Sequence, residues 1–276
     1  MKNRVKNVAA GIGYLALFFG TNILVSFVVE FVYGIKAGVE MAVSGVEMNQ
    51  QVLLQGLMEF VTKYTTVITM AYQLLTLGLI WLIFKIRKKC FCHEIALSVF
   101  NKKAIVPILV MGLAVQFFVS YVMELLPIPE ALLNAYVQAS SPILENQNLF
   151  LQIVALAVVA PITEEIIFRG FILSRFKKAM PTSLAVVLSS VLFGLVHLQL
   201  LWVIYAALIG ILLAIIAEQE KSIGASILLH MAINFSALFV ELIPVEGMAM
   251  GIVCVVAFAI IVAMLYTVVK KEEKGY

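Results

Sequence analysis

The chain has 276 residues, of which 63% are hydrophobic and 13% charged, and its formal net charge is +3. A soluble globular domain is about half apolar and about a quarter charged. This composition therefore excludes an ordinary soluble protein and predicts a lipid bilayer as the solvent for most of the chain. Because no basic stretch is interleaved with aromatic residues, the sequence predicts no nucleic-acid partner.

Eight hydrophobic segments follow one another along the chain. A membrane-spanning helix needs about 20 mostly apolar residues, and the candidate segments are 8–33, 64–84, 104–126, 149–172, 183–199, 201–217, 222–243 and 247–269. The first segment follows three basic residues, but it is too long for a signal peptide and lacks a clear cleavage site. Only the tripeptide 197–199 separates the fifth segment from the sixth, so a count of seven helices stays open. The sequence predicts an all-α, polytopic membrane bundle of about eight helices, with residues 1–276 as a single domain.

The charges of the connections alternate along the chain. Basic residues cluster at the N-terminus (Lys2, Arg4, Lys6), after the second segment (Lys85, Arg87, Lys88, Lys89, Lys102, Lys103), after the fourth (Arg175, Lys177, Lys178) and at the C-terminus (Lys270, Lys271, Lys274). The other connections lean acidic (Glu40, Glu47, Glu59; Glu124, Glu130, Glu145; Glu241, Glu246), with Lys36 and Lys63 as exceptions. Positive residues mark cytoplasmic loops, so the pattern predicts a multi-pass protein of the cell membrane with both termini in the cytoplasm. The longer outer connections, 34–62 and 127–148, are expected to hold short interfacial helices.

The three cysteines are too few for a disulfide framework. Cys90, Cys92 and His93 form a C-x-C-H sequence in a predicted cytoplasmic loop. This cluster lacks a fourth ligand, so it does not predict a zinc site. Cys254 lies in an apolar segment and is expected to be a packing residue.

The fourth segment carries charged residues at positions where a membrane helix rarely has them. Glu164, Glu165 and Arg169 fall within six positions, and each charge at mid-membrane costs at least about 2.5–3.5 kcal/mol. Glu165 and Arg169 are four residues apart with the acid first, the favourable order for an ion pair within a helix. Glu164 lies about 100° away around the helix, with Phe168 on its own face and no local charged partner. Glu164 is therefore the candidate general base, and Pro161, one turn earlier, is expected to disturb the helix near it.

Two further segments carry histidines. The fifth contains Phe193 and His197, together with Ser190 and Gly194, whose small-x-x-x-small spacing favours a close helix contact. The seventh contains His230 and Asn234, which are four residues apart and share one helix face. A single membrane histidine is often only an interhelical hydrogen-bond partner. Two histidines, an asparagine and an unpaired glutamate on three helices favour a functional site.

Three motifs together resemble a known family. Glu-Glu-x-x-x-Arg (164–169), Phe-x-x-x-His (193–197) and His-x-x-x-Asn (230–234), in this order on separate hydrophobic segments, resemble the CPBP (Abi) family of intramembrane proteases. This family includes the type II CAAX prenyl proteases, or Ras-converting enzymes. The resemblance covers about residues 149–240, the predicted catalytic core, and it implies an eight-helix fold.

The resemblance also implies a role for each motif residue. Glu164 and His197 would activate a water, and His230 and Asn234 would hold the oxyanion. Glu165 and Arg169 would support them, with Phe168 and Phe193 beside the site. Members of the family are often named metalloproteases, and Glu164, His197 and His230 could ligate zinc. The spacing is not that of a His-Glu-x-x-His motif, so the sequence favours a site without a tightly bound metal. It identifies no cofactor, and zinc stays the one alternative.

The leading hypothesis is an intramembrane endopeptidase that cleaves a membrane-associated peptide or protein near the cytoplasmic side. Its role would be peptide processing, bacteriocin self-immunity or regulation. The alternative is a non-catalytic membrane protein that binds a membrane protein partner, as an immunity protein or a modulator of a sensor kinase. A transporter is a third class, but the halves of the chain show no repeat.

The expected depths of the site residues in the membrane differ. At about 1.5 Å per residue, Glu164 comes out roughly 8–12 Å from the cytoplasmic face and His197 roughly 21 Å. Convergence of these residues therefore depends on the tertiary structure.

Overall fold

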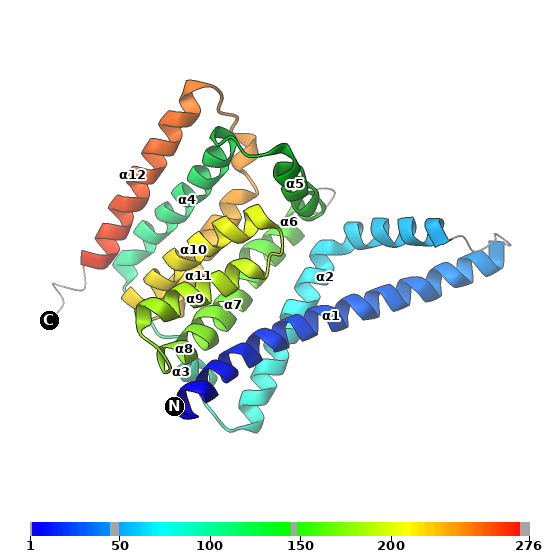
Figure 1. Cartoon of the computed structure of the whole chain (residues 1–276), viewed down its shortest axis with the longest axis horizontal. Helices are drawn as coiled ribbons and strands as arrows, with labels where there is room; N and C mark the ends of the chain where they lie inside the picture. Colours follow the sequence, from blue (N-terminus) through cyan, green and yellow to red (C-terminus); the bar gives the residue numbers. More distant parts are fainter. Residues whose placement is uncertain (1, 45–49, 145–147, 271–276) are drawn as a thin grey trace.

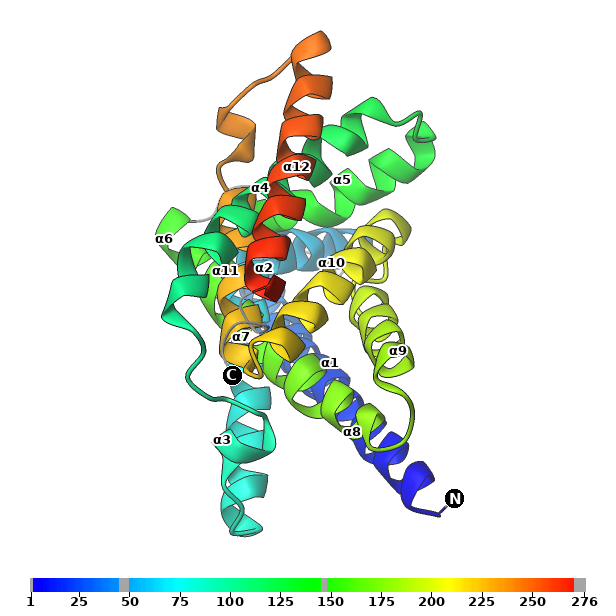
Figure 2. The ribbon, with the colours of Figure 1, turned by 90° about the vertical axis from the view of Figure 1, so that its left-hand side faces the viewer.

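The computed structural model describes residues 2–44, 50–144 and 148–270 (Figures 1 and 2). All regular secondary structure within these ranges is helical. The predicted all-α class of a multi-pass membrane protein is therefore confirmed. Four residues of the charge pattern, Glu47, Glu145, Lys271 and Lys274, lie outside the described ranges.

Each of the eight hydrophobic segments forms a helix. In chain order they are α1 (Lys2–Ser44), α2 (Gln50–Ile86), α4 (Ile105–Leu125), the continuous helix from α6 to α8 (Leu149–Lys177), α9 (Thr182–Leu195), α10 (Leu200–Gln219), α11 (Ile223–Ala237) and α12 (Met248–Lys270). The fifth and sixth segments are separate helices, because the chain between Leu195 and Leu200 leaves the helical conformation.

The predicted count of eight membrane crossings is not confirmed. In the described part of the chain, six helices are long and apolar enough to cross a membrane. The other two, α9 with 14 residues and α11 with 15, reach only about 22 Å at 1.5 Å per residue, whereas the hydrocarbon core is about 30 Å thick.

The first outer connection differs from the prediction of short interfacial helices. The helix α1 continues through 34–44, and α2 already begins at Gln50. No proline interrupts these stretches, so the membrane helices simply extend. At 43 residues, α1 is about 65 Å long, and its far half projects, together with the first part of α2, away from the other helices (Figure 1). The second outer connection does contain a short helix, α5 (Glu130–Leu144).

Small residues set the close contacts between helices. A Cβ atom at Gly194 of α9 would lie 2.4 Å from the carbonyl oxygen of Val203 in α10. A Cβ atom at Gly210 of α10 would lie 3.1 Å from the Cβ of Ser190. The close contact predicted from Ser190 and Gly194 is thus present, and it joins α9 to α10.

Polar contacts at one end of the bundle tie the connections together. The short helix α3 (Phe91–Glu94) ends with Glu94, which forms an ion pair with Arg175 of α8 (Ser174–Lys177). The Ser222 hydroxyl, at the start of α11, donates to the carbonyl of Ser98 at 2.5 Å. Lys177 pairs with Glu218 of α10. These contacts fix the ends of α8, α10 and α11 relative to one another.

Candidate active site

The catalytic candidates of the first motif lie on a helix that changes its winding. Between Leu149 and Lys177, the π-helical stretches η2 (Ile153–Val159) and η3 (Ile166–Leu173) flank the α-helical turn α7 (Ala160–Glu165). Such π turns are rare and are frequently found at functional sites. Glu164 lies near the middle of this helix, because the helix continues past residue 172 to Lys177.

Glu165 and Arg169 form the ion pair expected from their spacing. Arg169 Nη1 donates to Glu165 Oε1 at 2.6 Å, and the two side chains are 1% and 0% exposed. Arg169 Nη2 donates to the carbonyl of Gly210 at 2.8 Å. Two charges buried so deeply are stable only as a pair with further hydrogen bonds, and α10 supplies one through that carbonyl.

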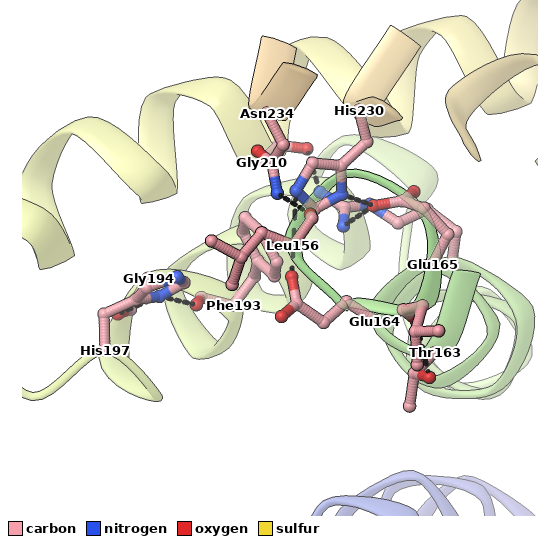
Figure 3. A network of polar contacts seen from close by, with 12 residues as sticks. Leu156, Thr163, Glu164, Glu165, Phe193, Gly194, His197, Gly210, His230 and Asn234 are labelled. Carbon is pink, nitrogen blue, oxygen red and sulfur yellow. Dashed lines mark hydrogen bonds and ion pairs between the residues drawn. The ribbon is translucent and has the colours of Figure 1, made fainter. Parts of the chain in front are cut away.

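His230 joins both glutamates in one network (Figure 3). Its Nδ1 lies 3.0 Å from Glu165 Oε1, and its Nε2 lies 3.7 Å from Glu164 Oε2. The imidazole is therefore held between two carboxylates from the same helix. Glu165 is more than the partner of Arg169 that the sequence predicted, because it also orients His230.

His197 lies apart from this network. It follows α9, and its Nδ1 is 3.1 Å from the carbonyl oxygen of Phe193 and 3.3 Å from that of Gly194. Its ring also lies against Trp202, with centroids 5.1 Å apart. The histidine facing Glu164 in this structure is thus His230, whereas the resemblance pairs Glu164 with His197 (Figure 3).

The ring of Phe193 lies between the two histidines. Its centroid is 5.5 Å from that of His197 and 5.6 Å from that of His230, and both contacts are edge-to-face. Arg169 Cζ lies 4.6 Å from the same ring centroid, within the range of a cation–π interaction. Phe168 contacts Phe193 at 5.2 Å. The two predicted supporting phenylalanines therefore form the apolar wall of the site.

Asn234 contacts the backbone of the helix Leu149–Lys177, named the catalytic helix from here on because it carries the candidate base Glu164. Its Nδ2 donates to the carbonyl oxygen of Leu156 at 2.9 Å (Figure 3). His230 and Asn234 lie on one face of α11, as predicted from their spacing, and both meet the helix that carries Glu164.

The three suggested zinc ligands do not form a ligand set in this arrangement. Within the described ranges, no three His, Cys, Asp or Glu side chains lie close enough to share one metal ion. Glu164 and His230 are near one another, but Phe193 separates His197 from His230. A three-ligand catalytic zinc site does not fit this geometry.

Some contacts of the site had no signal in the sequence. The carbonyls of Leu156 and Gly210 accept hydrogen bonds from Asn234 and Arg169, and the Trp202 ring contacts His197. Every residue has the same backbone carbonyl, so the sequence does not show which carbonyls take part in the site. Pro161 is an indirect sign for Leu156, because it lies five residues later and has no N–H to donate.

Comparison with known proteins places the site in a family context. Residues 146–236 match the family model described as type II CAAX prenyl endopeptidase Rce1-like. These residues form an Rce1-like segment. The family resemblance predicted from the three motifs is thereby confirmed, and the Rce1-like segment contains every residue of the network described above.

Part of the chain is also similar to a curated bacterial protein. The chain is 33% identical over 97 residues to "Putative membrane peptidase YdiL" of Bacillus subtilis (strain 168). The alignment covers 35% of this chain and 40% of that protein, so the chain spans less than half the length of the relative it matches. No solved structure matches the chain significantly.

Proposed function

We propose that this protein is a membrane-embedded endopeptidase that hydrolyses a peptide bond of a membrane-associated peptide or protein. The observation that carries the proposal is the pair of Glu164 and His230, which lie 3.7 Å apart with side chains 14% and 6% exposed, inside an Rce1-like segment. Ionisable groups are costly within a membrane and are kept there mainly for function. A carboxylate and an imidazole that face each other can move a proton to and from a reacting group.

In the proposed reaction, Glu164 is the general base. It takes a proton from a water whose oxygen attacks the carbonyl carbon of the peptide bond. When the tetrahedral intermediate collapses, the C–N bond breaks and the same proton passes to the leaving amine. The products are a carboxylic acid and an amine, so atoms and charge balance without a further reactant.

His230 supports this step through its Nε2, which faces Glu164. Glu165 accepts from Nδ1 if that nitrogen carries the proton, and it stabilises positive charge on the ring when Nε2 is protonated too. A protonated Nε2 would donate to the oxyanion, the role that the resemblance implies for this residue. Arg169 supplies the positive charge that pairs with Glu165, with Arg169 Nη1 at 2.6 Å from Glu165 Oε1.

The first test compares the wild type with Glu164→Gln. Both proteins are reconstituted into liposomes with solubilised membrane proteins of an expression host, and new N-termini are identified by mass spectrometry. We expect termini that appear with the wild type and decrease at least about 100-fold with Glu164→Gln, since a general base contributes 10²- to 10⁴-fold. Glu124→Gln, which changes an exposed glutamate of α4, is the matched control and should retain full cleavage.

Identical N-termini with wild type and Glu164→Gln would contradict the peptidase proposal. The same outcome, with a cellular phenotype that survives Glu164→Gln, would favour the alternative of a non-catalytic membrane partner, such as an immunity protein or a sensor-kinase modulator. In either case, the identity of the cleaved or bound protein would distinguish a role in peptide processing from one in bacteriocin self-immunity or in regulation.

The two histidines are expected to differ in their contributions. His230→Ala should lower kcat about as much as Glu164→Gln, because His230 contacts both glutamates. His197→Ala should act mainly on KM, because its Nδ1 is used by its own turn while Phe193 separates it from His230, the partner of Glu164. His93→Ala, at an exposed position of α3, is the control. Equal losses of kcat for His197→Ala and His230→Ala would restore the pairing implied by the resemblance.

Metal dependence gives a separate prediction. Because Glu164, His197 and His230 do not form a common ligand set, we propose hydrolysis without a tightly bound zinc ion. Cleavage should therefore persist after dialysis against a chelator and should not increase when zinc is restored. Loss of cleavage that zinc reverses would show that the site rearranges around a metal.

A further inference from the structure

The carbonyl oxygen of Leu156 lacks a hydrogen-bond donor from its own helix. In the π-helical stretch η2, hydrogen bonds join residues five apart, and the N–H of Ala160 donates to the carbonyl of Ala155. The next donor in this series, to the carbonyl of Leu156, would be residue 161. That residue is proline, which has no N–H. The winding of η2 and Pro161 together leave one carbonyl free within the membrane.

A free carbonyl in this environment must find another donor, because no bulk water is available and each unsatisfied group is costly. The donor is Asn234, whose Nδ2 lies 2.9 Å from the Leu156 oxygen although the two residues are 78 positions apart. This bond joins α11 to the catalytic helix. One turn away on the same face of α11, His230 makes the second connection, to Glu165 at 3.0 Å.

We propose that Asn234 is a positioning residue: its amide replaces the N–H that Pro161 cannot supply to Leu156, and this bond holds His230 opposite Glu164. The proposal rests on the proposed peptidase function for its catalytic consequence, but the contact itself can be tested without a substrate. It assigns Asn234 a role through Leu156 instead of the direct oxyanion contact that the resemblance implies.

The two connections together explain why a single bond matters. The first is at Leu156, two turns before Glu164, and the second is at Glu165, directly after it. A helix held at two levels cannot rotate about either contact, so the Nε2 of His230 stays directed at Glu164. Without the Asn234 bond, α11 keeps one connection and the 3.7 Å approach between Nε2 and Oε2 is no longer fixed. A misplacement of about 1 Å can lower a rate about 100-fold.

The test is a double-mutant cycle with Asn234→Ala, Pro161→Ala and the double variant. Replacing Pro161 by alanine gives the Leu156 carbonyl a helical donor, the new N–H of residue 161 in the five-residue register. Asn234→Ala alone should lower the Tm in detergent by several degrees and reduce kcat about 10- to 100-fold with KM nearly unchanged. In the Pro161→Ala background, Asn234→Ala should have a much smaller effect on both quantities.

Two controls separate the contact from general damage. Ser236→Ala changes a residue of α11 whose hydroxyl bonds only to carbonyls of its own helix, at 2.9 Å each, and it should leave kcat unchanged. Pro107→Ala changes a proline in the first turn of α4 and should not rescue Asn234→Ala. If Asn234→Ala does not fold, Asn234→Leu keeps the side-chain volume, and Pro161→Ala should raise its folded yield.

Equal losses of Tm caused by Asn234→Ala in the two backgrounds would overturn the proposed contact, whether or not the protein cleaves peptides. Equal losses of kcat in the two backgrounds would overturn the positioning role and return Asn234 to the oxyanion site. Absence of cleavage by every variant, wild type included, would instead refute the peptidase function, and the Tm cycle would still decide the contact.

Discussion

At the scale of single residues, the site depends on how Glu165 is shared. Its Oε1 accepts from Arg169 at 2.6 Å and lies 3.0 Å from His230 Nδ1. Breaking a buried ion pair by removing one partner costs more than the pair contributes, because the remaining charge is left without water or a counter-ion. Arg169 is therefore expected to be essential to the fold as well as to the orientation of His230.

Arg169→Met should lower the free energy of unfolding by about 3–5 kcal/mol, because it leaves the Glu165 charge buried and uncompensated. The double variant Glu165→Gln/Arg169→Met should recover much of this loss, since it removes both charges. Denaturant titration in detergent measures these differences. Arg87→Met, at an exposed position after α2, is the control. Failure of the double variant to recover stability would show that the Gly210 contact of Arg169 matters more than the ion pair.

At the scale of helices, close packing of α9 on α10 positions the turn that carries His197. The turn begins after Leu195, one residue beyond Gly194, and the Nδ1 of His197 lies 3.1 Å and 3.3 Å from the carbonyl oxygens of Phe193 and Gly194 in the preceding helical turn. The backbone of α9 can approach α10 because Gly194 and Gly210 have no side chains where the helices meet. Small residues are common where membrane helices approach closely.

Gly194→Ala should destabilise the protein by about 1–3 kcal/mol, because the added methyl group would overlap the Val203 carbonyl and force the helices apart. It should also raise KM through the displaced His197. Thermal unfolding and peptide cleavage measure the two effects. Gly78→Ala of α2 is the matched control, since a Cβ there meets nothing within 4 Å, and it should be neutral or slightly stabilising. Equal stability of both variants would contradict the close-contact argument.

At the scale of the whole molecule, the basic connections and the ion pairs Glu94–Arg175 and Lys177–Glu218 gather at one end of the bundle. Six crossings or eight would both be an even number, and an even number would place the two termini on one side of the membrane. The positive-inside rule assigns that side to the cytoplasm, which stays a prediction.

The exposed cysteines test this orientation. Cys90, directly before α3, and Cys92, within α3, are exposed, whereas Cys254 is buried in α12. A membrane-impermeant thiol reagent should leave intact cells unlabelled and should modify the protein after permeabilisation. Cys90→Ser/Cys92→Ser should abolish the labelling under both conditions. Modification of the wild type in intact cells would place this end, and the termini with it, outside.

The sequence by itself determined the features that depend on near neighbours in the chain. Eight apolar segments became helices because a backbone in lipid must satisfy its own hydrogen bonds, and Glu165 met Arg169 because residues four apart share a helix face. Only the tertiary structure decided which histidine faces Glu164. That choice depends on how α9 and α11 pack against the catalytic helix, with Phe193 between His197 and His230. It likewise decided that Asn234 meets Leu156, because a free carbonyl arises from the winding of a helix and its donor comes from another helix.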